Sequence, residues 1–257
     1  MELDWLTIAA GLGAGLACGF LNTAASSGSA VSLPVLVLLG LDPITANATN
    51  RIPVLVGAIS GTASFHFRHS VPWRTAFFAA IPTTLGALAG ALVAESIPVR
   101  GVGLVITAAV LAAFLLLLTK FKHALEYSGT GTERFGNREF VVLFAVGLWL
   151  GLIVLDGATY LLLTLTLVVG LDLFKANGVK NALLVPTTLV AILVFMYRGH
   201  IVWTIGIAMG VGSIVGGILG ARLATAPNAK RYIIGLLVFI IGAELVNLGI
   251  RFVLQAR

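Results

Sequence analysis

The stretch that decides the fold reads Asn22-Thr23-Ala24-Ala25-Ser26-Ser27-Gly28-Ser29, and it lies inside an apolar run from about Trp5 to Gly40. As one continuous helix this run would be about 54 Å long, whereas the hydrocarbon core of a bilayer is about 30 Å thick. Small hydroxyl side chains and glycine compete with the helical backbone, and Pro34 follows soon afterwards. The run therefore predicts a broken or re-entrant element, not a plain span.

The composition places the whole chain in a membrane. Of its 257 residues, 59% are hydrophobic and 10% are charged, and the mean hydropathy is +1.06. Soluble domains contain about 25% charged residues, so a soluble protein of this kind could not cover its surface with polar groups. The net charge of +6 comes from Lys and Arg that lie mostly between apolar runs. This placement indicates orientation in a bilayer and no nucleic-acid partner.

The apolar runs predict an all-α, polytopic membrane protein of two halves. The first half, 1–119, contains the broken element and three spans at about 44–67, 73–95 and 100–119. The polar segment 120–139 is expected to be a linker, on the cytoplasmic side. The second half, 140–257, begins with a long apolar stretch to Gly170, and spans follow near 174–197, 203–224 and 232–254.

The two halves repeat one another. Shifting the sequence by 130 residues, without a gap, superposes Gly40-Leu41-Asp42 on Gly170-Leu171-Asp172 and Ala46-Asn47 on Ala176-Asn177. Internal repeats are common in secondary transporters, whose binding sites lie at the repeat interface. If each broken element returns to its starting side, the repeats are inverted, and if each crosses once, they are parallel. The distribution of Lys and Arg among the loops leans toward the inverted arrangement without deciding it.

The strongest candidates for a binding site are two cations inside apolar spans. Arg51 follows Asn47 and Asn50, and the repeat places Asn177, Lys180 and Asn181 at the equivalent positions. Each half thus offers one cation and one amide, with Asn50-Arg51 aligned to Lys180-Asn181. Arginine and amide N–H groups together suit an oxyanion. The alternative is that both cations extend to the interface or pair with Asp42 and Asp172.

The interruptions add further candidates. Unwound backbone and helix N-termini offer N–H donors to an anion, so we nominate the polar and glycine positions of the first interruption as binding residues, namely Asn22, Thr23, Ser26, Ser27, Gly28 and Ser29. In the second half, Asp156 aligns with Ser26. Asp156 could neutralise the charge of Lys180, carry a proton or cap a half-helix. Glu244, in the last span, is a second candidate for carrying protons or forming an ion pair, because a carboxylate at membrane depth is a candidate functional residue. The alternative is that Glu244 is protonated and packed.

The pattern Gly19-Phe20-Leu21-Asn22-Thr23-Ala24-Ala25-Ser26-Ser27-Gly28-Ser29, with Ala46-Asn47-Ala48-Thr49-Asn50-Arg51, resembles the TauE/SafE family of sulfite exporters, also called the toluene-sulfonate uptake permease family. The resemblance covers nearly the whole chain. It implies a multi-pass protein of a bacterial or archaeal cell membrane that transports sulfite, sulfoacetate or another organosulfonate. A phosphate-binding loop of the G-x-x-x-x-G-K-[ST] type does not occur, so direct use of ATP is not expected.

The leading hypothesis is therefore a secondary transporter of a small anion, coupled to protons, that works by alternating access. A passive anion channel is the alternative, since it would use the same cations without a moving gate. An enzyme is not expected, because the four histidines show no metal-ligand spacing and the serines have no base nearby in sequence. Neither a metal nor a cofactor is predicted, and the sequence is compatible with an oligomer.

Overall fold

The structure, a computed structural model, describes residues 5–96 and 135–226, together with Gly235. Within these ranges every element is a helix, as the sequence predicts: α1 (Trp5–Ala25), α2 (Gly28–Leu38), α3 (Pro43–Thr49), α4 (Arg51–Phe67), α5 (Trp73–Ala94), α8 (Asn137–Leu152), α9 (Gly157–Leu167), α10 (Leu173–Tyr197) and α11 (Trp203–Ala224). The spans expected at 100–119 and 232–254, and most of the linker, lie outside the described residues.

Four of the described helices, α1, α5, α10 and α11, are long and apolar enough to cross a membrane. Large apolar side chains such as Leu85, Leu193 and Val211 are exposed on the outside, whereas Arg51 and Lys180 are buried. An exposed apolar surface of this extent is unfavourable in water, but it matches the apolar interior of a bilayer. The distribution of side chains therefore fits a membrane protein.

Both long apolar runs are interrupted, as predicted. Ser26 separates α1 from α2, and Asp156 lies in the loop between α8 and α9. The two residues occupy equivalent repeat positions and have φ angles of 62° and 57°. This left-handed conformation is uncommon for residues other than glycine. Gly40 and Gly170, also equivalent, have φ angles of 90° and 94°, so the local backbone follows the same path in both halves.

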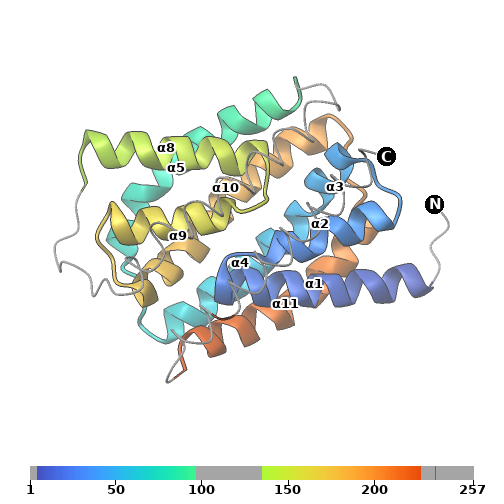
Figure 1. Cartoon of the computed structure of the whole chain (residues 1–257), viewed down its shortest axis with the longest axis horizontal. Helices are drawn as coiled ribbons and strands as arrows, with labels where there is room; N and C mark the ends of the chain where they lie inside the picture. Colours follow the sequence, from blue (N-terminus) through green and yellow to red (C-terminus); the bar gives the residue numbers. More distant parts are fainter. Residues whose placement is uncertain (1–4, 97–134, 227–234, 236–257) are drawn as a thin grey trace, which may run out of the picture.

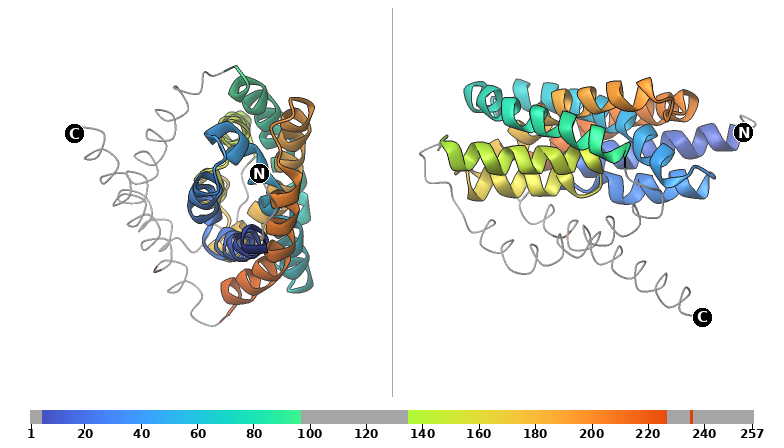
Figure 2. Two further views of the ribbon diagram at one scale, coloured as in Figure 1. Left: turned by 90° about the vertical axis from the view of Figure 1, so that its right-hand side faces the viewer. Right: turned by 90° about the horizontal axis from the view of Figure 1, so that it is seen from above.

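Each interrupted run folds into a hairpin. In Figure 1, α1 begins at the right-hand end of the molecule and α2 returns toward it, whereas α8 begins at the left-hand end and α9 returns there. Figure 2 shows these four helices in one layer and α4, α5, α10 and α11 in the other. The halves interlock, because α1 packs mainly on α11 and α8 packs mainly on α5. The tips of both hairpins lie inside the molecule, against the second layer.

The span expected at 44–67 is helical, but a local break at Asn50 separates it into α3 and α4. Pro53 lies in the first turn of α4 and has no N–H to donate to the carbonyl of Thr49. Proline in a helix also crowds the carbonyl four residues earlier. The equivalent residue in the second half is Leu183, and there α10 continues without a break.

The second half begins slightly earlier than expected. Asn137 starts α8, so the last three residues assigned to the linker form the first helical turn. The Glu139 side chain accepts a hydrogen bond from the backbone N–H of Gly136 at 2.8 Å. This bond satisfies a donor that the start of the helix leaves unpaired.

Glycines permit the close packing of α5 on α8. A Cβ atom added at Gly86 would overlap the backbone carbonyl of Phe144, and one at Gly90 would overlap that of Leu148. The repeat positions behave alike, because Gly216 and Gly220 of α11 lie against backbone carbonyls of α1. The Gly-x-x-x-Gly spacing is thus a helix-packing feature in both halves.

We expect Gly90→Ala to destabilise the protein. The methyl group of the introduced alanine has no room unless α5 and α8 separate. Overpacking of this kind lowers the free energy of unfolding by about 1 to 3 kcal/mol. The measurement is the thermal unfolding temperature of purified protein in detergent. Gly13→Ala is the matched control, because a Cβ at Gly13 meets nothing within 4 Å. Equal unfolding temperatures for Gly90→Ala and Gly13→Ala would contradict this account of the packing.

Candidate functional site

Both predicted cations are buried at the contact between the halves. Arg51 is 1% exposed and Lys180 is 0% exposed, so the alternative that they extend to the interface is wrong. The alternative pairing with aspartates is also wrong. The Asp42 side chain accepts hydrogen bonds from the start of α3, and Asp172 accepts one from the start of α10 and forms a salt bridge with Lys175.

Lys180, on α10, reaches the C-terminal end of α1. Its Nζ atom donates hydrogen bonds to the backbone oxygen of Asn22 at 2.6 Å, to that of Thr23 at 3.4 Å, and to Ser26 Oγ at 3.0 Å. The last four carbonyls of a helix lack partners within the helix. Lys180 therefore binds the end of the first broken helix in the opposite half.

Arg51, on α4, makes the equivalent contact with α8. Its two terminal nitrogens donate to the backbone oxygens of Leu150 and Gly151. The guanidinium carbon also lies 4.8 Å from the centre of the Phe195 ring, a distance suited to a cation–π interaction. Each cation thus binds carbonyls at the C-terminal end of the interrupted helix of the other half.

These contacts leave the positive charges uncompensated. Helix C-termini carry a partial negative charge of about half a unit, which orients a cation without neutralising it. Within residues 5–96 and 135–226, neither Arg51 nor Lys180 forms an ion pair with a carboxylate. A buried cation without a counter-ion is costly. An anion bound beside either cation would reduce that cost.

The predicted amides have different roles in this conformation. Asn47 bridges the interruption after α8, because Nδ2 donates to the oxygen of Leu152 and Oδ1 accepts from the N–H of Val154, each at 3.1 Å. The Asn177 Oδ1, Asn181 Oδ1 and both amide atoms of Asn50 are buried without a hydrogen-bond partner among the described residues. Three amides are therefore left with unused polar atoms, whereas that of Asn47 supports the backbone.

The remaining predicted binding residues make local contacts within the break between α1 and α2. The hydroxyl of Ser27 donates to the oxygen of Ala25 at 3.1 Å, and Gly28 lies so close to the Cys18 carbonyl that a Cβ would overlap it. Asn22 and Ser29 are buried, and Asn22 contacts Lys180 through its backbone. A direct contact of these side chains with substrate stays a prediction.

Asp156 is buried between α8 and α9, at 2% exposure. Both of its carboxyl oxygens lack a hydrogen-bond partner in the described part of the chain, and its side chain does not cap α9. Two of the three roles considered, a helix cap and a counter-ion of Lys180, are thus not seen here. A role in carrying protons stays a prediction. Glu244 lies outside the described residues.

Thr159 makes a contact between the halves that the sequence analysis did not predict. Its hydroxyl donates to the backbone oxygen of Ser26 at 3.1 Å and so joins the two interruptions directly. A signal was present, because Thr159 is the repeat equivalent of the nominated Ser29. Applying the shift to every nominated residue would have found it.

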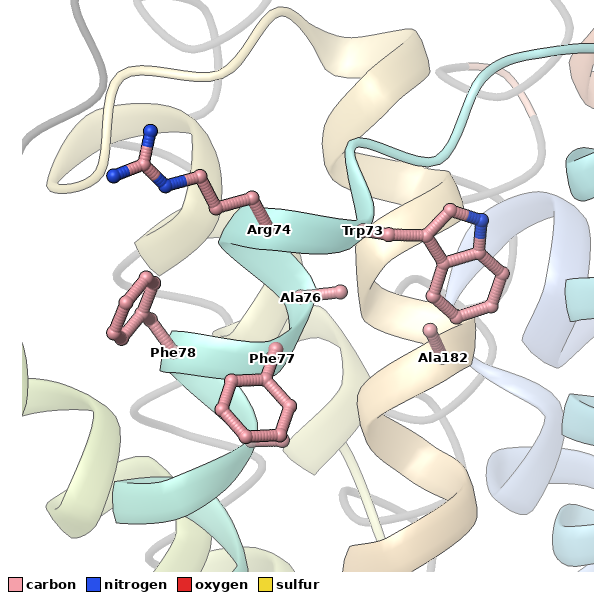
Figure 3. A pocket seen from close by; sticks show the side chains of 7 residues that line it. Trp73, Arg74, Ala76, Phe77, Phe78 and Ala182 are labelled. Atoms are coloured by element: carbon pink, nitrogen blue, oxygen red, sulfur yellow. The ribbon is translucent and has the colours of Figure 1, made fainter.

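A separate pocket lies on α5 and contains none of the predicted site residues. It has a volume of about 560 Å³, and its lining consists of Trp73, Arg74, Ala76, Phe77, Phe78, Ala80 and Ala182. Figure 3 shows Trp73 close to Ala182 of α10, whereas Arg74 and Phe78 extend from the other side of α5. Arg74 is its one charged lining residue, so the pocket is mainly apolar.

Comparison with known proteins finds relatives that are named as membrane transporters. The chain is similar to a probable membrane transporter protein, ORF9, of Sinorhizobium sp, with 26% identity over 217 residues that cover 82% of this chain and 81% of that protein. It is also similar to the probable membrane transporter protein YfcA of Escherichia coli (strain K12), with 25% identity over 220 residues, covering 82% and 78%. No solved structure gives a significant match.

The family profile described as sulfite exporter TauE/SafE matches residues 11–245. That range includes both interruptions, both buried cations and most of the chain. Together with the apolar exterior and the helices long enough to span a bilayer, the match settles the class of the protein. The chain is a multi-pass integral membrane protein and belongs to the TauE/SafE family of membrane transporters.

Proposed function

We propose that the protein is a secondary transporter that moves a small anion, such as sulfite, sulfoacetate or another organosulfonate, by alternating access. The observation that carries the proposal is the pair of buried cations, Arg51 and Lys180, one from each half. Their partners are neutral backbone carbonyls and a hydroxyl. An anion is the ligand that best complements such a site.

The burial of the site supports alternating access over an open channel. Arg51 and Lys180 are almost fully covered, so an anion cannot reach them from either side without a rearrangement. Because each cation contacts the opposite half, a movement of one half against the other would change both contacts together. This arrangement favours a carrier, in which binding and opening are linked.

In this proposal the two halves are inverted repeats. The support comes from the two hairpins, which enter from opposite ends of the molecule (Figure 1). Inverted repeats that rock against each other around a central site are a common basis of alternating access.

Proton coupling would run through Asp156 or Glu244. A buried carboxylate without partners favours its neutral form, because burial disfavours the charge. Protonation during uptake would offset the charge of the anion, whose entry alone opposes a negative-inside potential. Export could be driven by the potential itself.

The proposal is tested with purified protein in proteoliposomes. We expect saturable uptake of labelled sulfite or sulfoacetate, acceleration of uptake by unlabelled substrate on the opposite side, and weaker uptake of a carboxylate of equal size. The pH gradient is varied at fixed potential. Flux that does not saturate and shows no counterflow would identify a passive channel instead, and absence of anion flux would refute the proposal.

A further inference from the structure

Two buried side-chain oxygens meet beside Gly61. A Cβ atom at Gly61 would lie 3.0 Å from Thr23 Oγ1 and 3.0 Å from Asn181 Oδ1. The three residues belong to α1, α4 and α10, and the side chains of Thr23 and Asn181 are both 0% exposed. The Thr23 methyl carbon lies at the same distance of 3.0 Å, so the three helices pack closely here, and we call the meeting of these two oxygens at Gly61 the niche.

Neither oxygen has a hydrogen-bond partner among the residues that the structure describes. Leaving a buried polar atom unpaired costs about 1 to 3 kcal/mol, and such atoms are rare in native proteins. Two of them at one place, beside a position without a side chain, indicate a site that a ligand completes.

The orientation of the Asn181 amide is fixed by its other contact. Nδ2 donates to the backbone oxygen of Asn177 at 2.9 Å, and a carbonyl oxygen can only accept. The amide therefore cannot be reversed, and Oδ1 faces Gly61 as an acceptor. The Thr23 hydroxyl can donate or accept. A ligand that satisfies both must bring a donor to Asn181 and an oxygen to Thr23.

The niche adjoins the cation site. Lys180 precedes Asn181 on α10, and its Nζ atom contacts the backbone of Thr23. A ligand could thus place its negative charge toward Lys180 and an O–H group toward Asn181. An oxyanion that has only acceptor atoms would instead face the lone pairs of Asn181 Oδ1.

We propose that Thr23, Gly61 and Asn181 form a specificity niche that selects small oxyanions carrying one O–H group over otherwise similar anions without a donor. A singly protonated inorganic oxyanion and a short hydroxyalkanesulfonate belong to this class. The inference rests on the proposed function, because it assumes that Lys180 attracts the anion. It adds the chemical group by which the site distinguishes substrates, and it identifies Gly61 as the residue whose lack of a side chain lets α4 approach the two oxygens.

The test compares two sulfonates of equal charge, 2-hydroxyethanesulfonate and ethanesulfonate, by their affinity for the purified full-length protein in detergent. We expect the wild type to bind the hydroxylated anion roughly tenfold more tightly, as one buried hydrogen bond would give. Asn181→Leu and Thr23→Val are each expected to reduce this preference, and Gly61→Ala to reduce it by narrowing the niche. Thr23→Val leaves the bond between Asn181 and Asn177 intact.

Ser64→Ala is the matched control on α4, because the Ser64 hydroxyl already donates to the oxygen of Ser60 at 2.9 Å, and it should keep the wild-type preference. Equal affinities of the wild type for the two sulfonates, or a full preference retained in both Asn181→Leu and Thr23→Val, would overturn the niche. If both sulfonates bind equally and Lys180→Ala abolishes both, the inference fails but the anion site stands. If neither anion binds the folded wild type, the proposed function fails as well.

Discussion

Lys180→Ala and Arg51→Ala are each expected to abolish anion binding. Both side chains are buried and lack an anionic partner among the described residues, so the ligand is expected to supply the neutralising charge. Breaking a buried charge interaction costs about 3 to 5 kcal/mol, and the dissociation constant should therefore rise by roughly two to four orders of magnitude. The measurement is calorimetric binding of sulfite and sulfoacetate to purified protein.

The controls separate loss of charge from loss of structure. Lys180 also binds the end of α1, so Lys180→Met, which keeps the length of the side chain, is measured beside Lys180→Ala. Lys175→Ala removes an exposed lysine of the same helix, and Arg68→Ala removes an exposed arginine at the end of α4. Both should bind like the wild type. Wild-type affinity in folded Lys180→Ala and Arg51→Ala would exclude this site.

Asp156→Asn is expected to uncouple transport from protons. Its carboxyl oxygens are buried at the interruption between α8 and α9 and have no hydrogen-bond partner within the described part of the chain. The amide keeps the shape of the side chain but cannot exchange a proton. In proteoliposomes, a proton gradient directed inward (outside more acidic) should stimulate uptake by the wild type and not by the variant. Exchange of substrate at equal pH should continue in both.

The matched control is Asp172→Asn. Asp172 belongs to the same half but caps α10 and pairs with Lys175, so coupling should be unaffected. A pH dependence in Asp156→Asn equal to that of the wild type would remove Asp156 from the mechanism. Glu244→Gln would then be the remaining candidate to examine.

Features that depend on neighbouring residues could be predicted from the sequence. The interruption at Ser26 follows from small polar residues within an apolar run, and the shift by 130 residues places the second interruption at Asp156. The boundaries of α11 agree with the expected span at 203–224. The break at Asn50 within the expected span at 44–67 is also a local feature, because Pro53 cannot donate a hydrogen bond to the preceding turn.

Contacts between distant residues required the tertiary structure. Arg51 lies 99 and 100 residues from the carbonyls that it binds, and Lys180 lies 154 to 158 residues from its partners. No pattern in the sequence indicates that each cation crosses to the opposite half. The same holds for the amide of Asn47, which binds backbone 105 residues away, and for the meeting of Thr23 with Asn181 beside Gly61.

The sequence by itself determined that this is a helical membrane protein with two interrupted runs and one cation within an apolar span of each half, because hydropathy and backbone breaks are local properties. The tertiary structure decided how those cations are held and which polar atoms stay unpaired. Packing of helices from both halves fixes those distances, and packing depends on the shapes of residues far apart in the chain.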